Sequence, residues 1–170
     1  EVYLKVKGKG GHAAMPHNNI DPILIASHII VGLQQIVSRA CNPAIPSVLS
    51  FGKIIGEGAT NVIPDEVNIQ GTFRTLDEDW RFEAHDRIKE MASGIANSMG
   101  GECEVDLRVG YPFVINDIEL SEKARGSAIE YLGESNVVEL PIRMTGEDFS
   151  YYSQAMPGCF YRLGTSSQNG

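Results

Sequence analysis

Alternating hydrophobic and polar positions mark four segments of this chain. In residues 2–6 apolar side chains alternate with polar or amphipathic ones, which predicts a strand with one buried face. Residues 47–55, 67–73 and 103–111 also have the pattern of strands. The polar side of the 67–73 strand is expected to face solvent or a ligand.

Two longer segments repeat their apolar residues at the spacing of a helix. The first starts after Asp21 and Pro22, an N-cap followed by a proline at the first helical position. The second is predicted to begin with a capping box formed by Thr75 and Glu78, and the glycine pair at 100–101 ends it. The order β-α-β-β-α-β predicts an α+β, ferredoxin-like fold: a four-stranded antiparallel sheet with both helices on one face.

The last third of the chain has a weaker pattern. Asp117 is a candidate N-cap for a third helix that Gly133 would end, with its apolar residues turned inward. Apolar pieces at 137–138 and 159–163 predict two short strands, and a short helix is expected near Glu147.

The change of pattern near Pro112 also predicts the domain organisation. We expect one domain over residues 1–112 and an incomplete α/β segment over residues 113–170. The second segment resembles the edge of a larger sheet, so its helix is expected to expose apolar surface. The chain opens without Met and is interpreted as the middle of a longer protein.

Charge and composition exclude several classes of function. The 170 residues carry a net charge of −8, which argues against binding nucleic acid or docking on an anionic membrane. No apolar run is expected to approach the roughly 20 residues that span a bilayer. Three widely spaced cysteines without a CxxC pair indicate reduced thiols and a cytoplasmic protein.

A glycine-rich loop at residues 8–11 precedes the first candidate for chemistry, His12. Glycines let the backbone approach a partner closely, but the spacing does not match a phosphate-binding loop. On spacing alone, a histidine with only local hydrogen bonds and a functional histidine are equally good interpretations. His17 is interpreted as structural.

Two further polar residues are candidates, one in the loop before the third predicted strand and one on that strand. The amide of Asn61 could donate to or accept from a substrate carbonyl or carboxylate, or the residue could simply belong to a loop. Arg74, on the polar side of its strand, could bind a carboxylate with both arms of its guanidinium, or be a solvated surface charge.

The adjacent carboxylates of Glu147 and Asp148 have two interpretations. They could take part in a metal site or in acid–base chemistry, but such a pair more often caps a helix, and we favour that role for at least one. No HExxH motif or His/Asp/Glu cluster occurs, so no metal ligand is assigned. His28 and His85 are expected to be surface or flanking residues of the two helices.

Taken in order, these segments resemble the aminoacylase, hippurate hydrolase and auxin-conjugate hydrolase group of dinuclear-metal peptidases. The matching stretches are GKGGHAA (8–14), PH (16–17), DPI (21–23), LQ (33–34), SR (38–39), NVIPDEV (61–67), GTFRT (71–75), EDF (147–149) and PG (157–158). Each stretch alone is weak, but their ordered set covers nearly the whole chain.

The resemblance implies that residues 1–112 are the dimerisation (lid) domain, and the remainder part of the catalytic domain. It implies hydrolysis of N-acyl amino acids by water bound to two divalent ions, zinc or manganese, whose ligands lie outside this chain. His12 would reach the partner subunit's site and stabilise the oxyanion, while Asn61, Arg74 and Glu147 would lie at the substrate. A homodimer through the lid sheet is expected.

A non-catalytic dimerisation or ligand-binding module remains the alternative, because ferredoxin-like folds serve many functions. Metal analysis separates the two interpretations of the site: two tightly bound zinc ions on this chain would contradict ligands that lie elsewhere.

Overall fold

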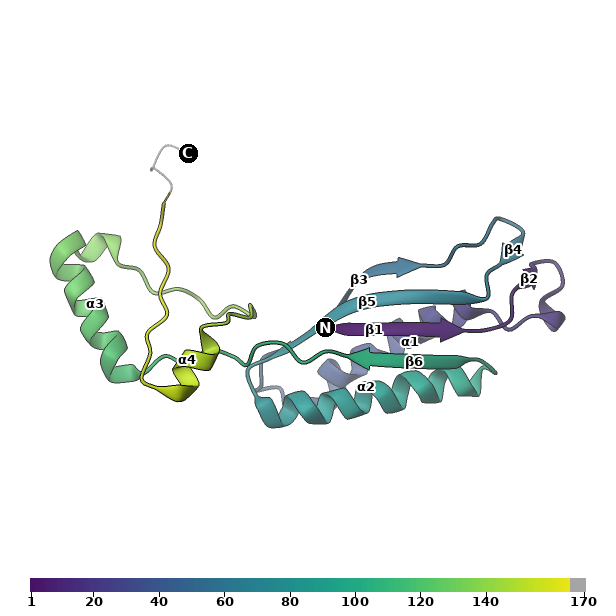
Figure 1. Ribbon diagram of the computed structural model, residues 1–170, viewed down its shortest axis with the longest axis horizontal. Coiled ribbons are helices and arrows are strands. Elements are labelled where there is room, and N and C mark those ends of the chain that lie inside the picture. The colour runs from purple at the N-terminus through teal and green to yellow at the C-terminus, as the bar shows by residue number, and fades with distance from the viewer. Residues whose placement is uncertain (166–170) are drawn as a thin grey trace. The chain divides into compact units, whose positions relative to one another are not determined.

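Four antiparallel strands form the main sheet of the computed structural model, which describes residues 1–165. Their order across the sheet is β3-β5-β1-β6 (Figure 1). The strands are β1 (Val2–Lys7), β3 (Ser47–Ile55), β5 (Glu66–Thr75) and β6 (Glu102–Leu107). This is the strand order of a ferredoxin-like sandwich, so the predicted fold is confirmed.

Two helices cover one face of this sheet (Figure 1). Helix α1 (Pro22–Gln35) continues into a π-helical turn, η2 (Ile36–Ala40), and α2 (Glu78–Ser98) precedes β6. The alternating burial of β1 follows the predicted pattern, because every second side chain points at the helices. The fully buried large side chains include Leu4, Ile25, Ile29, Leu33, Ile36, Ile69 and Ile88.

The two helix starts differ in how well the sequence predicted them. Asp21 caps α1 as expected, since its Oδ1 accepts from the backbone N–H groups of Ile23 at 2.8 Å and Leu24 at 3.1 Å. The capping box predicted for α2 is wrong, because Asp77 is the N-cap and accepts from Trp80 N–H at 2.7 Å. Thr75 is instead the last residue of β5 and is buried.

One helical stretch, Pro22–Ala40, is long and apolar enough by length and composition to cross a membrane, contrary to our expectation from the sequence. Its inner side, however, packs against the sheet, and Ile25, Ile29 and Leu33 are at most 1% exposed. These contacts are those of the core helix of a domain.

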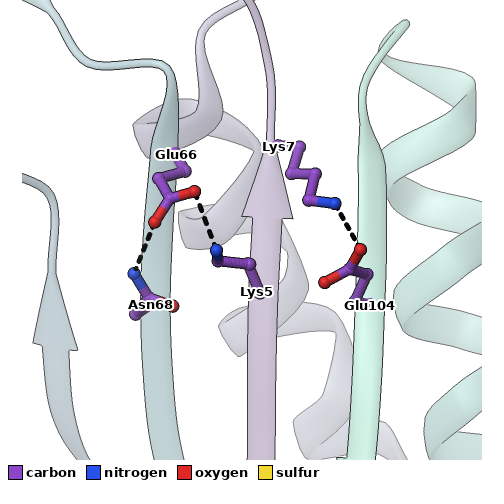
Figure 2. Close-up of polar contacts among 5 residues, drawn as sticks. All are labelled: Lys5, Lys7, Glu66, Asn68 and Glu104. Carbon is purple, nitrogen blue, oxygen red and sulfur yellow. Dashed lines mark hydrogen bonds and ion pairs between the residues drawn. The ribbon is translucent and has the colours of Figure 1, made fainter.

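The other face of the sheet is polar, as the pattern of β5 predicted (Figure 2). Lys5 forms an ion pair with Glu66 at 2.9 Å, and Lys7 pairs with Glu104 on the neighbouring strand. The hydrogen bond from Lys5 lowers the pKa of Glu66, and that from Lys7 to Glu104 raises the pKa of Lys7. Such exposed pairs keep this face soluble but add little stability.

The chain divides into two compact units, the first of which is Glu1–Gly110. The second, from Tyr111 onward, contains α3 (Ile118–Leu132), the 3-10 helix η3 (Glu134–Asn136) and α4 (Ser150–Ala155). Asp117 and Gly133 cap α3 as predicted.

The strands predicted in the second unit are wrong. Residues 137–138 and 159–163 are irregular, because an isolated apolar run needs a neighbouring strand to pair with and none lies beside them in the described part of the unit. The apolar side chains of α3, expected to turn inward, are not buried either, and Ile118 is 82% exposed. The expected exposure of apolar surface on this helix is confirmed.

Candidate functional site

A small second sheet lies beyond one end of the main sheet (Figure 1). It consists of β2 (Gly11–His12) and β4 (Val62–Ile63), which pair antiparallel with His12 opposite Val62. It joins the glycine loop after β1 to the loop before β5. Two segments that the sequence marked separately therefore form one cluster.

Close packing between the two loops explains why residue 10 is a glycine. A Cβ on Gly10 would lie 2.5 Å from the carbonyl oxygen of Ile63, so any side chain there would force the two loops apart. Asp65 fixes the same approach, because its Oδ1 accepts from Gly10 N–H at 2.8 Å and its carbonyl accepts from Gly8 N–H at 2.9 Å.

The side chain of His12 is exposed, but its orientation is constrained. Its Nδ1 accepts a hydrogen bond from the backbone N–H of Ala14 at 3.1 Å. Because a backbone N–H can only donate, the neutral ring carries its proton on Nε2. His12 can therefore offer a neutral N–H donor to a group outside the loop.

Asn61 belongs to the same cluster as His12. Its carbonyl accepts from Ala13 N–H at 3.0 Å, next to the rung that pairs His12 with Val62. The residue is exposed. His12 and Asn61 thus lie close together at the tip of the first unit.

Arg74 lies at the opposite end of the sheet. Strand β5 begins at Glu66, opposite Lys7, and passes Val2 at Gly71 before it reaches Arg74. At about 3.3 Å per residue, eight residues of strand separate the level of the β2–β4 sheet from Arg74 by roughly 26 Å. Within one subunit the structure therefore does not bring Arg74 to His12.

The second unit contains Glu147. Its Oε1 lies 3.7 Å from Nη2 of Arg162, and neither side chain is fully buried. The capping role favoured for Glu147 or Asp148 is wrong, because α4 has Phe149 at its N-cap and no side-chain capping bond. The partner of Glu147 is 15 residues away along the chain, so no local pattern could have indicated it.

Within residues 1–165, no group of three or more His, Cys, Asp or Glu side chains could hold a metal ion. The residues described here therefore do not fit a metal pair. His28 is exposed on α1, as expected. His85, however, is not a surface residue: it is 8% exposed, its ring centroid lies 6.0 Å from that of Phe73, and burial lowers its pKa.

Two loop residues beside His12 were not identified from the sequence. Asp65 holds Gly10, and the side chain of Asn19 donates to the carbonyl of His12 at 3.0 Å. Asparagine and aspartate are common in any loop, so composition gave no signal for either contact.

The fold and this loop cluster define a class of protein. The sequence profile of the peptidase dimerisation domain of the M20 peptidases matches residues 1–100, and the chain belongs to this family.

Individual relatives extend the match. The chain is 39% identical over 168 residues to an IAA-amino acid hydrolase of Arabidopsis thaliana, covering 96% of the chain and 38% of the relative. It is 38% identical over 166 residues to the N-acetyl-L-cysteine deacetylase of Bacillus subtilis, covering 98% and 39%. The chain thus spans about two fifths of the length of these relatives.

A solved structure agrees with the sequence matches. A dinuclear metal-binding peptidase of the M20 family from Bacillus subtilis superposes with a TM-score of 0.64 at 29% identity, over 92% of this chain and 38% of that one. The similarity extends beyond the dimerisation domain into the second unit.

Proposed function

We propose that the full-length protein hydrolyses the amide bond of N-acyl amino acids, and that this chain supplies its dimerisation domain and one catalytic residue, His12. The family supports the reaction type, and the names of the two curated relatives support the substrate class: one denotes an amino-acid conjugate and the other an N-acetylated amino acid.

The hydrogen bond from Ala14 to His12 carries the proposed role of His12. Negative charge develops on the carbonyl oxygen when an amide is attacked, and a fixed N–H donor stabilises it. With Nδ1 occupied as an acceptor, Nε2–H is the group that donates. Removal of one such donor typically costs about 2.7–4 kcal/mol of barrier.

The positions of the polar residues support an active site shared between subunits. His12 and Asn61 lie at the tip of the first unit, and Arg74 lies at the end where the chain leaves it, since a Cβ on Gly110 would be 3.8 Å from Arg74 Nη1. A small substrate cannot reach both ends of one sheet. We therefore assign His12 and Asn61 to the active site of the partner subunit. Arg74 is assigned to the active site of its own subunit, where it would bind a substrate carboxylate.

The two edge strands of the main sheet, β6 and β3, are not equally suited to pair with a second copy of the chain. Strand β6 is short and carries three acidic residues, Glu102, Glu104 and Asp106, which oppose the approach of an identical edge. Strand β3 has nine residues with one charged side chain, Lys53, and leaves an edge of backbone groups available. The proposed homodimer forms through β3.

An apolar flank adjoins that edge. Helix α1 packs on the β3 side of the sheet, where Ile23 lies close to Gly56 just after β3 and is 42% exposed, while β3 itself exposes Ile54 by 51%. Burial of these side chains between two copies would add a hydrophobic contribution to the strand pairing. The name of the family's domain, a dimerisation domain, agrees with this use of the surface.

Two divalent ions, zinc or manganese, are proposed for the full-length protein, because a solved relative is described as dinuclear metal-binding. Such ions would polarise the scissile carbonyl and activate water. The described residues offer no group of ligands for such ions. Elemental analysis of the full-length protein should find two ions per subunit, and a metal-free active enzyme would contradict the proposal.

The decisive experiment replaces His12 in the full-length protein. His12→Ala should lower kcat for an N-acetyl amino acid by about 10²–10³-fold, because the oxyanion loses one donor. His17→Ala is the matched control, since this histidine is exposed in the same loop and should leave kcat unchanged. An unchanged kcat in His12→Ala would refute the oxyanion role.

A further inference from the structure

We propose that Asn19 is a positioning residue for His12: its side-chain amide holds the peptide that carries the imidazole, and it acts on the reaction only through that histidine. This inference rests on the proposed function of His12.

The backbone carbonyl of His12 points away from β4. Ala13 N–H bonds to Asn61 on one side of the His12–Val62 rung, so His12 occupies a position of the small sheet whose own backbone groups point away from β4. Its carbonyl oxygen accepts instead from the side chain of Asn19, with Nδ2 at 3.0 Å. The peptide group between His12 and Ala13 is thus held on one side by Asn61, which accepts from Ala13 N–H, and on the other side by Asn19, which donates to the His12 carbonyl.

The second observation is close packing of the same amide against Gly11. A Cβ placed on Gly11 would lie 2.3 Å from Oδ1 of Asn19, so the amide occupies the space that a side chain would take. The two ends of the Asn19 amide therefore contact consecutive residues, Gly11 and His12. Such a contact restricts rotation of the peptide as well as its position.

The third observation is that Asn19 is anchored while the tip around it is exposed. Residues 12–18 are all exposed, whereas Asn19 is half-buried. The next residue, Ile20, exchanges two backbone hydrogen bonds with Lys9, at 2.8 and 2.9 Å. Asn19 therefore connects the exposed tip to a segment that is fixed to the body of the domain.

Another hydrogen bond to the His12 carbonyl cannot replace this one. Met15 N–H also donates to it at 2.9 Å, but Met15 belongs to the same exposed turn and would move together with the histidine. Without the Asn19 amide the turn can tilt as a body, and the imidazole leaves the position at which Nε2–H meets the oxyanion.

The test is a double-mutant cycle in the full-length protein. Asn19→Ala should lower kcat about tenfold while KM changes less than about twofold, because substrate binding does not depend on the donor. In a His12→Ala background the same change should have no further effect, because no imidazole remains to be misplaced. Loss of folded protein would instead lower kcat equally in both backgrounds.

Two further variants sharpen the cycle. Asn19→Asp keeps the shape of the side chain but loses the N–H donor, so it should be at least as impaired as Asn19→Ala. Asn18→Ala, at the exposed neighbouring position, should leave kcat unchanged.

Equal losses in both backgrounds, or full activity of Asn19→Asp, would overturn the inference. If His12→Ala impairs the enzyme and Asn19→Ala does not, only the role of Asn19 is refuted. If His12→Ala itself has no effect, the proposed function fails, and the positioning role fails with it.

Discussion

At the scale of single residues, environment separates side chains of the same type. His12 and His17 lie in one exposed loop, yet only His12 accepts a hydrogen bond from the backbone at Nδ1. That bond comes from a residue two positions along, so the sequence contained both partners but no signal that the chain would turn back between them. The chemical role of a loop histidine therefore depends on the turn that holds it.

His85 predicts a dependence of stability on pH. Burial is the main cause that lowers its pKa below the ordinary 6.5, so the unfolded chain binds the proton more readily than the folded one. This contribution to stability is present above pH 6.5 and is lost as the pH falls through 6.5 toward the folded-state value. Urea unfolding at pH 7.5 and 5.5 measures the difference.

Two variants isolate the contribution of His85. His85→Leu should reduce the loss of stability between these pH values, because no buried imidazole remains to be protonated. His28→Gln, in the exposed histidine of α1, should retain the wild-type difference. An identical pH dependence in all three proteins would contradict the assignment.

At the scale of elements, the sequence predicted those that bury a face in a shared core. The alternation in β1 and β5 and the helical repeat of α2 are recognisable because the opposite face meets water. Strands β2 and β4 were missed, since two residues are too few to show a period. Their pairing joins residues about 50 positions apart and depends on the fit of Gly10 against Ile63.

The start of α2 gives a prediction about capping. Asp77→Ala should lower the free energy of unfolding by about 1 kcal/mol, because Trp80 N–H loses its acceptor. Asp86→Ala, in the exposed middle of the same helix, should cost nothing measurable. Chemical denaturation of both variants would decide the matter, and equal losses would mean that charge, not capping, explains the effect.

Strand β3 gives a prediction about assembly. Ile54→Lys places a charge at the exposed end of the proposed interface, and we expect it to weaken dimerisation by about tenfold or more. Glu102→Lys is the control at the opposite edge of the sheet, on β6, and should leave the dimer intact. Sedimentation equilibrium over a range of concentrations distinguishes the two. A dimer disrupted by Glu102→Lys alone would move the interface to β6.

At the scale of the whole molecule, the opposite positions of His12 and Arg74 predict complementation between subunits. Protein with His12→Ala in one subunit and Arg74→Ala in the other would have one active site with both residues intact. Random mixing of the two variants should restore about a quarter of the wild-type activity, because half the dimers are mixed and each has one complete site.

The homodimers of each variant provide the baseline for this experiment. Each should have low activity, since every one of their sites lacks a residue. If the mixture is no more active than these homodimers, then His12 and Arg74 of one site come from the same subunit.

The length of β1 and β5 has a consequence of its own. The number of residues in these strands sets the distance between the imidazole of His12 and the guanidinium of Arg74 within one subunit. Two residues added to each strand would extend that spacing by about 6.6 Å and keep every side chain on its face. One residue added to each strand would instead move every side chain beyond the insertion to the opposite face of the sheet. Insertions or deletions of two residues in both strands should therefore preserve the fold, whereas those of one residue should not. Either change should abolish catalysis, because it alters the distance between His12 and Arg74.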